Sequence, residues 1–348
     1  MKVISFFNNK GGVGKTTLTC NLASVFSKEL KKRVLVIDCD PQCNATVLIL
    51  GEDRTVPIYW DTIVPPENPP ISTLLDVLKP IEVGDSSINP SITPVSAIAN
   101  RFEVDLLPGH PRMSIIEDRL SDAWRGTSAG DIGGLRKTNW CSLFCDSLKD
   151  KYDIIFLDLG PSLGSLNRTC LLGSDFFVTP MGADIFSIIG LRNIGDWLQQ
   201  WTKIYSQGVK LCDESNKTDI DNFAVRRSIP ITNGFAGYTV QAYIAKYIGG
   251  ERRPTKAFEK ILHTFPEEIE KNLGGFKPSH ITTENFTLGE VPNMYSLVPL
   301  AQAVSSPICY LKSSDHLVGT HYTQVANYKK ILVEVACSLA HNVGIEES

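Results

Sequence analysis

The chain has 348 residues, of which 43% are hydrophobic and 21% charged, a balance typical of a globular protein with a substantial buried core. Its formal net charge of −4 argues against a protein that holds nucleic acid on a strongly basic surface, so DNA binding would require a local basic patch. No run approaches the roughly 18 apolar residues of a membrane-spanning helix, and the opening MKVISFF is too short for a secretory signal, which predicts a cytoplasmic protein.

The first forty residues predict a strand, a glycine-rich turn, a helix and a second strand. The apolar, β-branched run KVISFF (2–7) precedes three glycines, and residues 16–32 then place leucine, valine and phenylalanine side chains on one helical face. RVLVID (33–38) is a second buried strand. A strand–helix–strand unit of this length predicts two parallel strands.

The same alternation continues along the chain. Further strand-like runs lie at 103–108, 152–159, 175–181, 227–232 and 286–292, and helical patterns lie at 188–207, 257–273 and 322–343, the second interrupted or kinked at Pro266. This order predicts an α/β protein with a doubly wound, mostly parallel sheet flanked by helices.

Three stretches do not follow the alternation. Residues 52–101 are rich in loop-forming residues, and the four glycines of 121–139 have no strand–helix context, which predicts a loop. Residues 209–226 are polar and charged. We expect one domain over 1–348 with insertions near 52–101 and 209–285.

The segment KGGVGKTT (10–17) predicts a phosphate-binding loop, although Asn9 stands where the general pattern G-x4-G-K-[ST] has glycine. Small residues let backbone N–H groups turn toward phosphate, and the helix that follows directs its N-terminus at the negative charge. Lys15 would reach the terminal phosphates, and the Thr16 hydroxyl would bind Mg²⁺. The predicted nucleotide-binding residues are Lys10, Gly11, Gly12, Val13, Gly14, Lys15, Thr16 and Thr17.

Two predicted strands end in carboxylates. Asp38 and Asp40 are two residues apart, and FLDLGPS (156–162) brings Asp158 to the carboxyl edge of the sheet. Beside a phosphate loop, such carboxylates act through Mg²⁺ or position an attacking water.

The three segments KGGVGKTT, VIDCDPQCNAT and YDIIFLDLGPSLG together resemble the deviant Walker A ATPases of the ParA/MinD type. The resemblance covers about residues 1–50, 100–200 and 286–345. It implies a P-loop ATPase that binds ATP and Mg²⁺, forms a homodimer on ATP, and hydrolyses ATP slowly to position a plasmid, a chromosome or another cargo. A ParB-like adaptor or another activating protein, and non-specific DNA, are the implied partners, with nucleoid association if DNA is bound.

The resemblance also assigns roles to residues. It makes Lys10 the signature lysine that reaches the ATP of the partner subunit, Asp40 the residue that orients the attacking water, and Asp158 the Walker B aspartate. Asp38 would act through magnesium and its waters. Asn233, Pro292 and Asn293 resemble the adenine-contacting positions. Gly160 departs from the family, in which many members have proline.

Several alternatives remain open. The loop begins at residue 10, which predicts no N-terminal helix-turn-helix domain, so DNA would be bound without sequence preference. Candidate basic groups, equally typical of charged surface loops, are Arg226–Arg227, Arg252–Arg253 with Lys256, and Lys329–Lys330. A second alternative is a nucleotide-gated scaffold that binds only proteins, through its insertions. It would have the same nucleotide-site residues as a DNA-positioning ATPase.

Four further readings have less support. A MinD-like membrane-associated regulator needs a basic amphipathic C-terminal helix, whereas 322–343 has core-packing spacing, so stable membrane insertion is not expected. An iron-protein-like electron carrier needs a bridging cysteine, and the nearest, Cys170, lies in a predicted helix. The pairs Cys39–Cys43 and Cys141–Cys145 lack the partners of a zinc set, and no residue indicates phosphoryl transfer to a small molecule.

Overall fold

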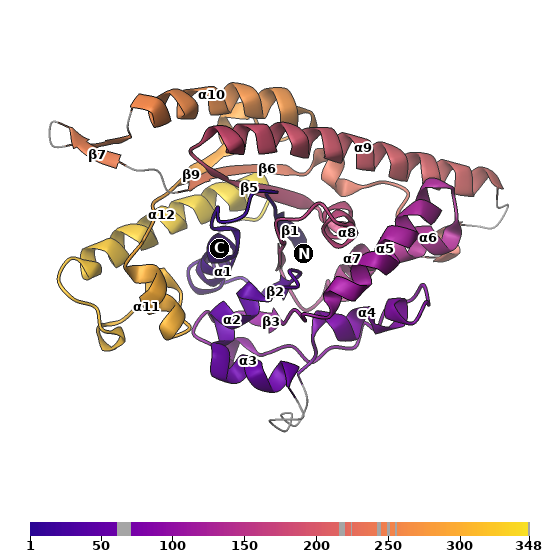
Figure 1. Cartoon of the computed structure of the whole chain (residues 1–348), viewed down its shortest axis with the longest axis horizontal. Coiled ribbons are helices and arrows are strands. Elements are labelled where there is room, and N and C mark those ends of the chain that lie inside the picture. Colours follow the sequence, from indigo (N-terminus) through magenta and orange to yellow (C-terminus); the bar gives the residue numbers. More distant parts are fainter. Residues whose placement is uncertain are drawn as a thin grey trace.

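The computed structural model describes residues 1–60, 71–215, 220–223, 225–241, 245–248, 251–254 and 256–346. A seven-stranded, all-parallel sheet runs through the molecule in the order β3-β2-β4-β1-β5-β6-β9, and helices cover both of its faces (Figure 1). The doubly wound α/β fold predicted from the sequence is therefore confirmed. The sheet strands are β1 (Lys2–Phe6), β2 (Val34–Asp38), β3 (Asp105–Leu107), β4 (Ile154–Asp158), β5 (Phe176–Gly182), β6 (Phe235–Gln241) and β9 (Thr287–Val291).

The strands and helices form two apolar layers, one on each side of the sheet. Every residue of β2 and β4 is buried, as expected for parallel strands covered on both faces. One layer packs against α1 (Lys15–Lys28), α2 (Asn44–Leu50), α11 (Leu297–Ala303) and α12 (His321–Asn342). The other packs against α4 (Leu74–Glu82), α5 (Met113–Ser128), α6 (Ile132–Thr138), α7 (Trp140–Asp146), α8 (Ser165–Gly173), α9 (Ile185–Ser215) and α10 (Lys256–Leu273).

Two predicted element types are wrong, and glycines explain both errors. Residues 121–139 belong mostly to the helices α5 and α6 and not to a loop. Their glycines serve packing: a Cβ added at Gly134 would lie 2.6 Å from the Thr127 nitrogen, so the glycine lets α6 touch α5. Residues 227–232 form no strand; Pro230–Asn233 is a 3₁₀ helix, and the strand is β6. Gly237 in β6 has a φ of +125° and lies beside a shift in the register between β5 and β6. This irregularity interrupts the alternation of side chains by which a strand is recognised in the sequence.

The predicted insertions contain more regular structure than expected. Residues 52–101 include α3 (Glu52–Tyr59) and α4, while residues 61–70 lie outside the described residues. α9 continues to Ser215, and a hairpin of β7 (Ala245–Ile248) and β8 (Glu251–Pro254) precedes α10. α10 passes through Pro266 without interruption, so of the two predicted alternatives, an interruption or a kink, the interruption is wrong. Within the described ranges, no helix is both long and apolar enough to cross a membrane.

Candidate functional site

The carboxyl ends of β1, β2 and β4 bring the predicted phosphate loop and two carboxylates together. The strands are parallel and in register, so that Asp38 of β2 is the direct neighbour of Asp158 of β4, and Asp158 pairs in turn with Phe6 of β1. The loop that follows β1 therefore begins beside Asp158, with Asp38 one strand further along the sheet. Segments from distant parts of the chain thus meet at one edge of the sheet.

The loop has the backbone that phosphate binding requires. Gly12 and Gly14 have φ of +73° and +75°, in the left-handed region that favours glycine. α1 begins immediately afterwards at Lys15, and no side chain forms a capping hydrogen bond at Gly14. The first N–H groups of α1 thus face the loop, where a phosphate group would accept their hydrogen bonds.

Lys15 and Thr16 meet Asp158 at the start of α1. The Thr16 hydroxyl donates to Asp158 Oδ2 at 2.8 Å, and the Thr19 hydroxyl lies 3.3 Å from Asp158 Oδ1. Lys15 is 7% exposed, and its ammonium donates to the backbone oxygen of Lys10 at 3.1 Å. Burial lowers the pKa of Lys15, although the charges of Asp158 and Asp40 oppose this effect.

Burial disfavours the charged form of both Asp38 and Asp158. Burial, with the charge of Asp38, raises the pKa of Asp158 to about 8. Burial raises the pKa of Asp38 to about 6, although hydrogen bonds from Thr46 and from the Asp40 N–H oppose this effect. A cation beside Asp158 would relieve this cost.

The donor chemistry fits magnesium in part. Thr16 and Asp158 offer oxygen ligands, which Mg²⁺ prefers. Within the part of the chain that the structure describes, no three histidine, cysteine or acidic side chains converge to hold a metal alone. Mg²⁺ would therefore take its remaining ligands from phosphate oxygens and water, as it does at many nucleotide sites.

Asp40 lies on the loop after β2, next to Gly160. Its side chain is buried and accepts a 2.9 Å hydrogen bond from the Gln42 N–H. A Cβ added at Gly160 would lie 3.0 Å from the Asp40 carboxyl carbon. The glycine at this position, where many family members have proline, therefore lies against the carboxyl group of Asp40.

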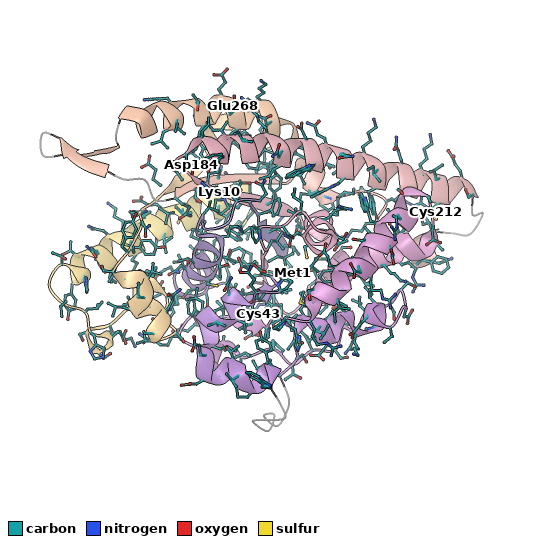
Figure 2. The ribbon with its side chains drawn as sticks, in the orientation of Figure 1. Met1, Lys10, Cys43, Asp184, Cys212 and Glu268 are labelled. Atoms are coloured by element: carbon teal, nitrogen blue, oxygen red, sulfur yellow. The ribbon has the colours of Figure 1, made fainter. Side chains whose placement is uncertain are left out.

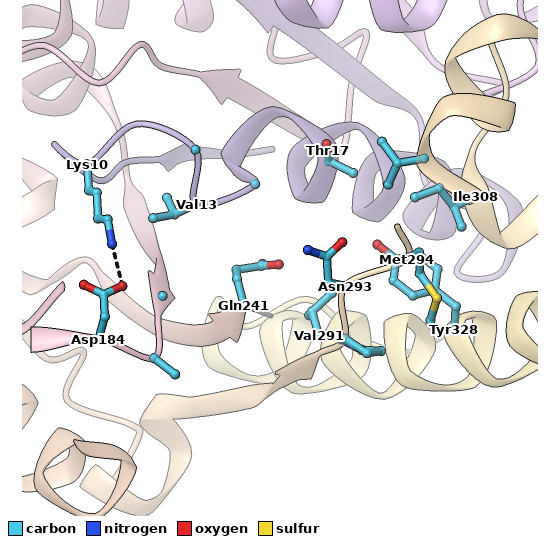
Figure 3. A pocket seen from close by; sticks show the side chains of 16 residues that line it. Lys10, Val13, Thr17, Asp184, Gln241, Val291, Asn293, Met294, Ile308 and Tyr328 are labelled. Atoms are coloured by element: carbon cyan, nitrogen blue, oxygen red, sulfur yellow. Dashed lines mark hydrogen bonds and ion pairs between the residues drawn. The ribbon is translucent and has the colours of Figure 1, made fainter. Parts of the chain in front are cut away.

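A cavity of about 510 Å³ opens beside the loop and continues to the end of β9 (Figure 3). Predicted residues Pro292 and Asn293 line it, and so does Gln241 at the carboxyl end of β6. Asn233 lies at the opposite, amino end of β6 and is not among the described lining residues, so the structure does not bring it to the site. Other lining side chains are Val13, Thr17, Val291, Met294, Ile308 and Tyr328.

Lys10 and Asp184 also line this cavity. Its ammonium forms an ion pair with Asp184 at 2.5 Å, which Figure 3 shows as a dashed line. The Lys10 N–H donates to Asn8 Oδ1 at 2.9 Å, and the Asn8 amide donates to the Pro180 oxygen of β5 at 2.7 Å. Sequence reasoning missed both Asp184 and Gln241. The signal available was their position, directly after β5 and at the end of β6.

Most of the candidate basic groups have acidic partners. Arg226 pairs with Asp146 at 2.8 Å, and Arg227 pairs with Asp213 at 3.1 Å. The side chains of Arg252, Arg253 and Lys256 lie outside those described. Lys329 pairs with Glu29 at 2.9 Å and lies over the ring of Tyr310, whereas Lys330 lines a separate surface cavity.

The chain matches one family model and is similar to ParA-like proteins from bacteria. The model of the family described as "AAA domain" matches residues 1–211. The virulence plasmid ParA family protein pGP5-D of Chlamydia psittaci is 31% identical over 197 residues, which cover 57% of this chain and 63% of that protein. The sporulation initiation inhibitor protein Soj of Bacillus subtilis is 29% identical over 194 residues, covering 56% and 63%. The chain thus matches less than two thirds of the length of these two relatives.

Solved structures resemble the chain over a longer span. Protein DIP2308 of Corynebacterium diphtheriae is 33% identical, with a TM-score of 0.73 and 99% of both chains covered. McdA of Cyanothece, in complex with ATP, has the same fold at 14% identity, with a TM-score of 0.61 and 100% and 98% of the two chains covered.

Proposed function

Since this chain belongs to the ParA/MinD-type family of P-loop ATPases, we propose that it is an ATP-dependent dimerising switch that hydrolyses ATP slowly to position or segregate DNA or another cargo. The observation that carries the proposal is the meeting of Lys15, Thr16 and Asp158 beside the 510 Å³ cavity. The cavity begins at the loop, where Gly12, Gly14 and Thr17 line it, and continues to apolar side chains such as Met294 and Tyr328. This shape suits a molecule with phosphates at one end and a flat base at the other.

Each residue would have a separate task. Lys15 and the N–H groups of residues 11–16 would bind the phosphates, while Pro292, Asn293 and Gln241 would line the base end. Thr16 and Asp158 would hold Mg²⁺, which would neutralise charge on the phosphate oxygens. Asp40 would orient the attacking water. Asp38 would act through magnesium and its waters, and the hydrogen bonds that it accepts from the Asp40 N–H and from Thr46 of α2 would also hold the loop after β2 in place.

Lys10 would act on the ATP of a second copy. The ammonium points toward Asp184 at the mouth of the cavity, and its side chain is 33% exposed. Lys10→Ala is expected to retain ATP binding within about threefold, because Lys15 supplies the charge inside the chain, but to lose the ATP-dependent dimer. Calorimetric titration and sedimentation velocity with a non-hydrolysable ATP analogue measure the two properties. Lys203→Ala, at an exposed lysine of α9, is the control. A normal dimer of Lys10→Ala would contradict the role in trans.

Membrane attachment through the C-terminal helix is not part of the proposal. α12 buries Leu332, Val335, Ala336 and Leu339 against the sheet, so these apolar residues are already used in the core. A basic amphipathic face of the kind that binds membranes would need apolar residues outside the core.

A switch that binds protein partners without DNA is the second candidate. The ion pairs of Arg226, Arg227 and Lys329 favour it, because neutralised side chains attract phosphate backbones weakly. Lys330 and the segment 251–256 remain the candidate DNA contacts.

One titration separates the two candidates. Asp40→Ala protein, which should retain ATP, is added to non-specific duplex DNA with ATP·Mg²⁺ or with ADP·Mg²⁺, at two salt concentrations. Salt-sensitive binding with ATP alone supports DNA positioning. The absence of binding in both nucleotide states supports a protein-partner switch.

A further inference from the structure

Four cysteines from three separate segments meet in one apolar layer of the fold. Cys39 follows β2, Cys141 and Cys145 lie on α7, and Cys170 lies on α8, and each is at most 1% exposed. The Cys141 sulfur is in hydrogen-bond contact with the thiols of Cys145 and Cys170. The Cys170 thiol is also in contact with that of Cys39. We call these four residues the thiol cluster.

The helices α7 and α8 pack closely at the positions of Cys141 and Cys170. Trp140 Nε1 donates to the Thr169 hydroxyl at 2.8 Å, and these two residues come directly before the two cysteines. A Cβ added at Gly173 of α8 would lie 2.8 Å from Cys141 Cβ and 3.1 Å from Cys141 Sγ, so the glycine lets α7 come this close. The packing of the two helices therefore fixes the contact between the two thiols.

Arg226 places a positive charge along the same helix. Its backbone N–H donates to Asn139 Oδ1 at 3.2 Å, just before α7, and its guanidinium pairs with Asp146 at 2.8 Å, at the end of α7. The side chain thus spans the turn that carries Cys141 and Cys145. Its Nη1 atom is buried and has no hydrogen-bond partner among the residues that the structure describes. A guanidinium in this position favours the negatively charged form of a nearby thiol.

Cys141 is the thiol of the cluster that loses its proton most readily. Hydrogen bonds from Cys145 and Cys170, with the charge of Arg226, lower the pKa of Cys141, although burial opposes them. The pKa values of the other three thiols are raised, chiefly by burial for Cys39 and Cys170 and by the hydrogen bond to Cys141 for Cys145. The thiolate is the form that reacts with oxidants. Since burial excludes large reagents, the oxidant that fits is a small one such as hydrogen peroxide, admitted when the 26% exposed side chain of Arg226 moves.

The geometry selects Cys170, and not Cys145, as the disulfide partner of Cys141. Two residues four positions apart on one helix have Cβ atoms roughly 5 to 6 Å apart. A disulfide needs Cβ atoms about 3.5 to 4.5 Å apart, so a bond between Cys141 and Cys145 would require α7 to unwind. Cys170 lies on another helix, whose close approach Gly173 permits.

We propose that a peroxide oxidises Cys141, that Cys170 then closes a disulfide with it, and that this disulfide slows ATP hydrolysis. In the first step, the Cys141 sulfur attacks one oxygen of hydrogen peroxide, the O–O bond breaks, and the released hydroxide takes up the thiol proton to give water, which leaves a sulfenic acid. In the second step, the Cys170 sulfur attacks the Cys141 sulfur, the S–O bond breaks, and hydroxide leaves with the Cys170 proton as water. Two thiols are oxidised, and one hydrogen peroxide is reduced to two waters.

The thiol cluster is joined to the proposed catalytic residues. Cys39 comes directly before Asp40, and Asn167, three residues before Cys170 on α8, donates to the Gly160 oxygen at 2.9 Å. Gly160 in turn lies against the Asp40 carboxyl group. The disulfide would draw its two sulfurs to about 2 Å and would remove the contact between Cys170 and Cys39, so α8 and the loop that it holds would shift relative to Asp40. The effect on hydrolysis rests on the proposed function, whereas the disulfide does not.

The first experiment locates the disulfide. Nucleotide-free, fully reduced protein is treated with a small excess of hydrogen peroxide, the remaining thiols are blocked with N-ethylmaleimide, and tryptic peptides are identified by mass spectrometry without reduction. Cleavage after Lys137, Lys149, Arg168 and Arg192 gives the fragments 138–149 and 169–192, which the disulfide should join. The joined fragments should separate on treatment with dithiothreitol.

Single substitutions identify the reacting thiols. Cys141→Ser and Cys170→Ser should each lose the joined fragments, whereas Cys145→Ser should keep them, and Cys141→Ala repeats the test if Cys141→Ser melts at a lower temperature. Cys212→Ser, at a buried cysteine of α9 (Figure 2), is the matched control and should keep them too. Arg226→Gln should slow the formation of the disulfide by about three- to tenfold, because the loss of a nearby positive charge reduces the thiolate fraction. Arg226→Lys should restore most of the rate.

The second experiment measures ATP hydrolysis before and after oxidation. Complete disulfide formation should lower the rate by about tenfold, since small displacements of a catalytic group have effects of this order. Dithiothreitol should restore the original rate. Cys141→Ser should hydrolyse ATP at the same rate with and without peroxide treatment.

The outcomes distinguish the failure of this inference from the failure of the proposed function. The absence of joined fragments in the unaltered protein, or their persistence in Cys141→Ser, overturns the disulfide. Unchanged kinetics of disulfide formation in Arg226→Gln overturn the role of the guanidinium. Joined fragments with an unchanged hydrolysis rate overturn the link to catalysis. If the reduced protein hydrolyses no ATP, the proposed function is wrong, while the peptide map still decides the disulfide.

Discussion

Lys15→Ala is expected to weaken ATP binding by about 100-fold or more, because two charge-assisted hydrogen bonds of about 1.5 kcal/mol or more each are lost. Lys15 is 7% exposed at the start of α1, within reach of the charges of Asp158 and Asp40, and its ammonium contacts the loop backbone. A buried cation in this position binds phosphate strongly because little water competes with it. Calorimetric titration of ATP·Mg²⁺ into the purified variant measures the loss.

Two controls make the Lys15 result specific. The melting temperature without nucleotide should stay close to that of the unaltered protein, which shows that the variant folds. Lys2→Ala, at a lysine on β1 whose ammonium lies over the Phe176 ring, should leave ATP affinity unchanged. Unaltered ATP affinity in Lys15→Ala would mean that residues 10–17 do not bind the phosphates.

Asp40→Ala is expected to lower the rate of ATP hydrolysis by a factor of about 10² to 10⁴, the usual contribution of a positioned acid–base group. ATP affinity should change by no more than about threefold, because Lys15, Thr16 and Asp158 remain and are the groups argued to bind the phosphates and Mg²⁺. The ATP-bound dimer should therefore persist instead of dissociating after hydrolysis. Phosphate release under single-turnover conditions, with light scattering on the same sample, measures both effects.

Two further variants show whether the negative charge of Asp40 or only its hydrogen bond to water supports ATP hydrolysis. Asp40→Asn retains a side chain that can hydrogen-bond water but removes the negative charge, so its rate should fall between the unaltered protein and Asp40→Ala. Asp53→Ala, at an exposed acid of α3, should hydrolyse ATP at the original rate. Hydrolysis at the original rate in Asp40→Ala would remove Asp40 from the mechanism.

In the structure, residues that are far apart in the chain line the cavity proposed to hold the nucleotide. Gln241 and Asn293 line one cavity with Val13 and Thr17 of the loop, and Figure 3 shows their side chains around it. The sequence placed a base contact at Asn233 because it assigned the sixth strand eight residues too early. With β6 at Phe235–Gln241, the carboxyl end of the strand is Gln241. Only that end of a parallel strand lies on the same side of the sheet as the loop.

The sequence alone determined the parts of this protein whose chemistry is local. The loop 10–17 needs only contiguous residues: left-handed glycines, a lysine and a threonine at the start of a helix. Asp38 and Asp158 follow continuous apolar strands, and parallel strands in a sheet must bring such endings to one edge. Local backbone preference and strand periodicity were therefore sufficient to predict that the loop 10–17 and the two carboxylates lie at one edge of the sheet.

Only the tertiary structure decided the pairing of Lys10 with Asp184, the closeness of Gly160 to Asp40, and the helices at 121–139. Lys10 and Asp184 are 174 positions apart, and no local pattern relates them. The glycines of α6 looked like loop residues because their use is to let one helix touch another, a contact that exists only after the chain has packed. Interactions of this kind depend on the distance between elements in space, which neither residue preference nor periodicity encodes.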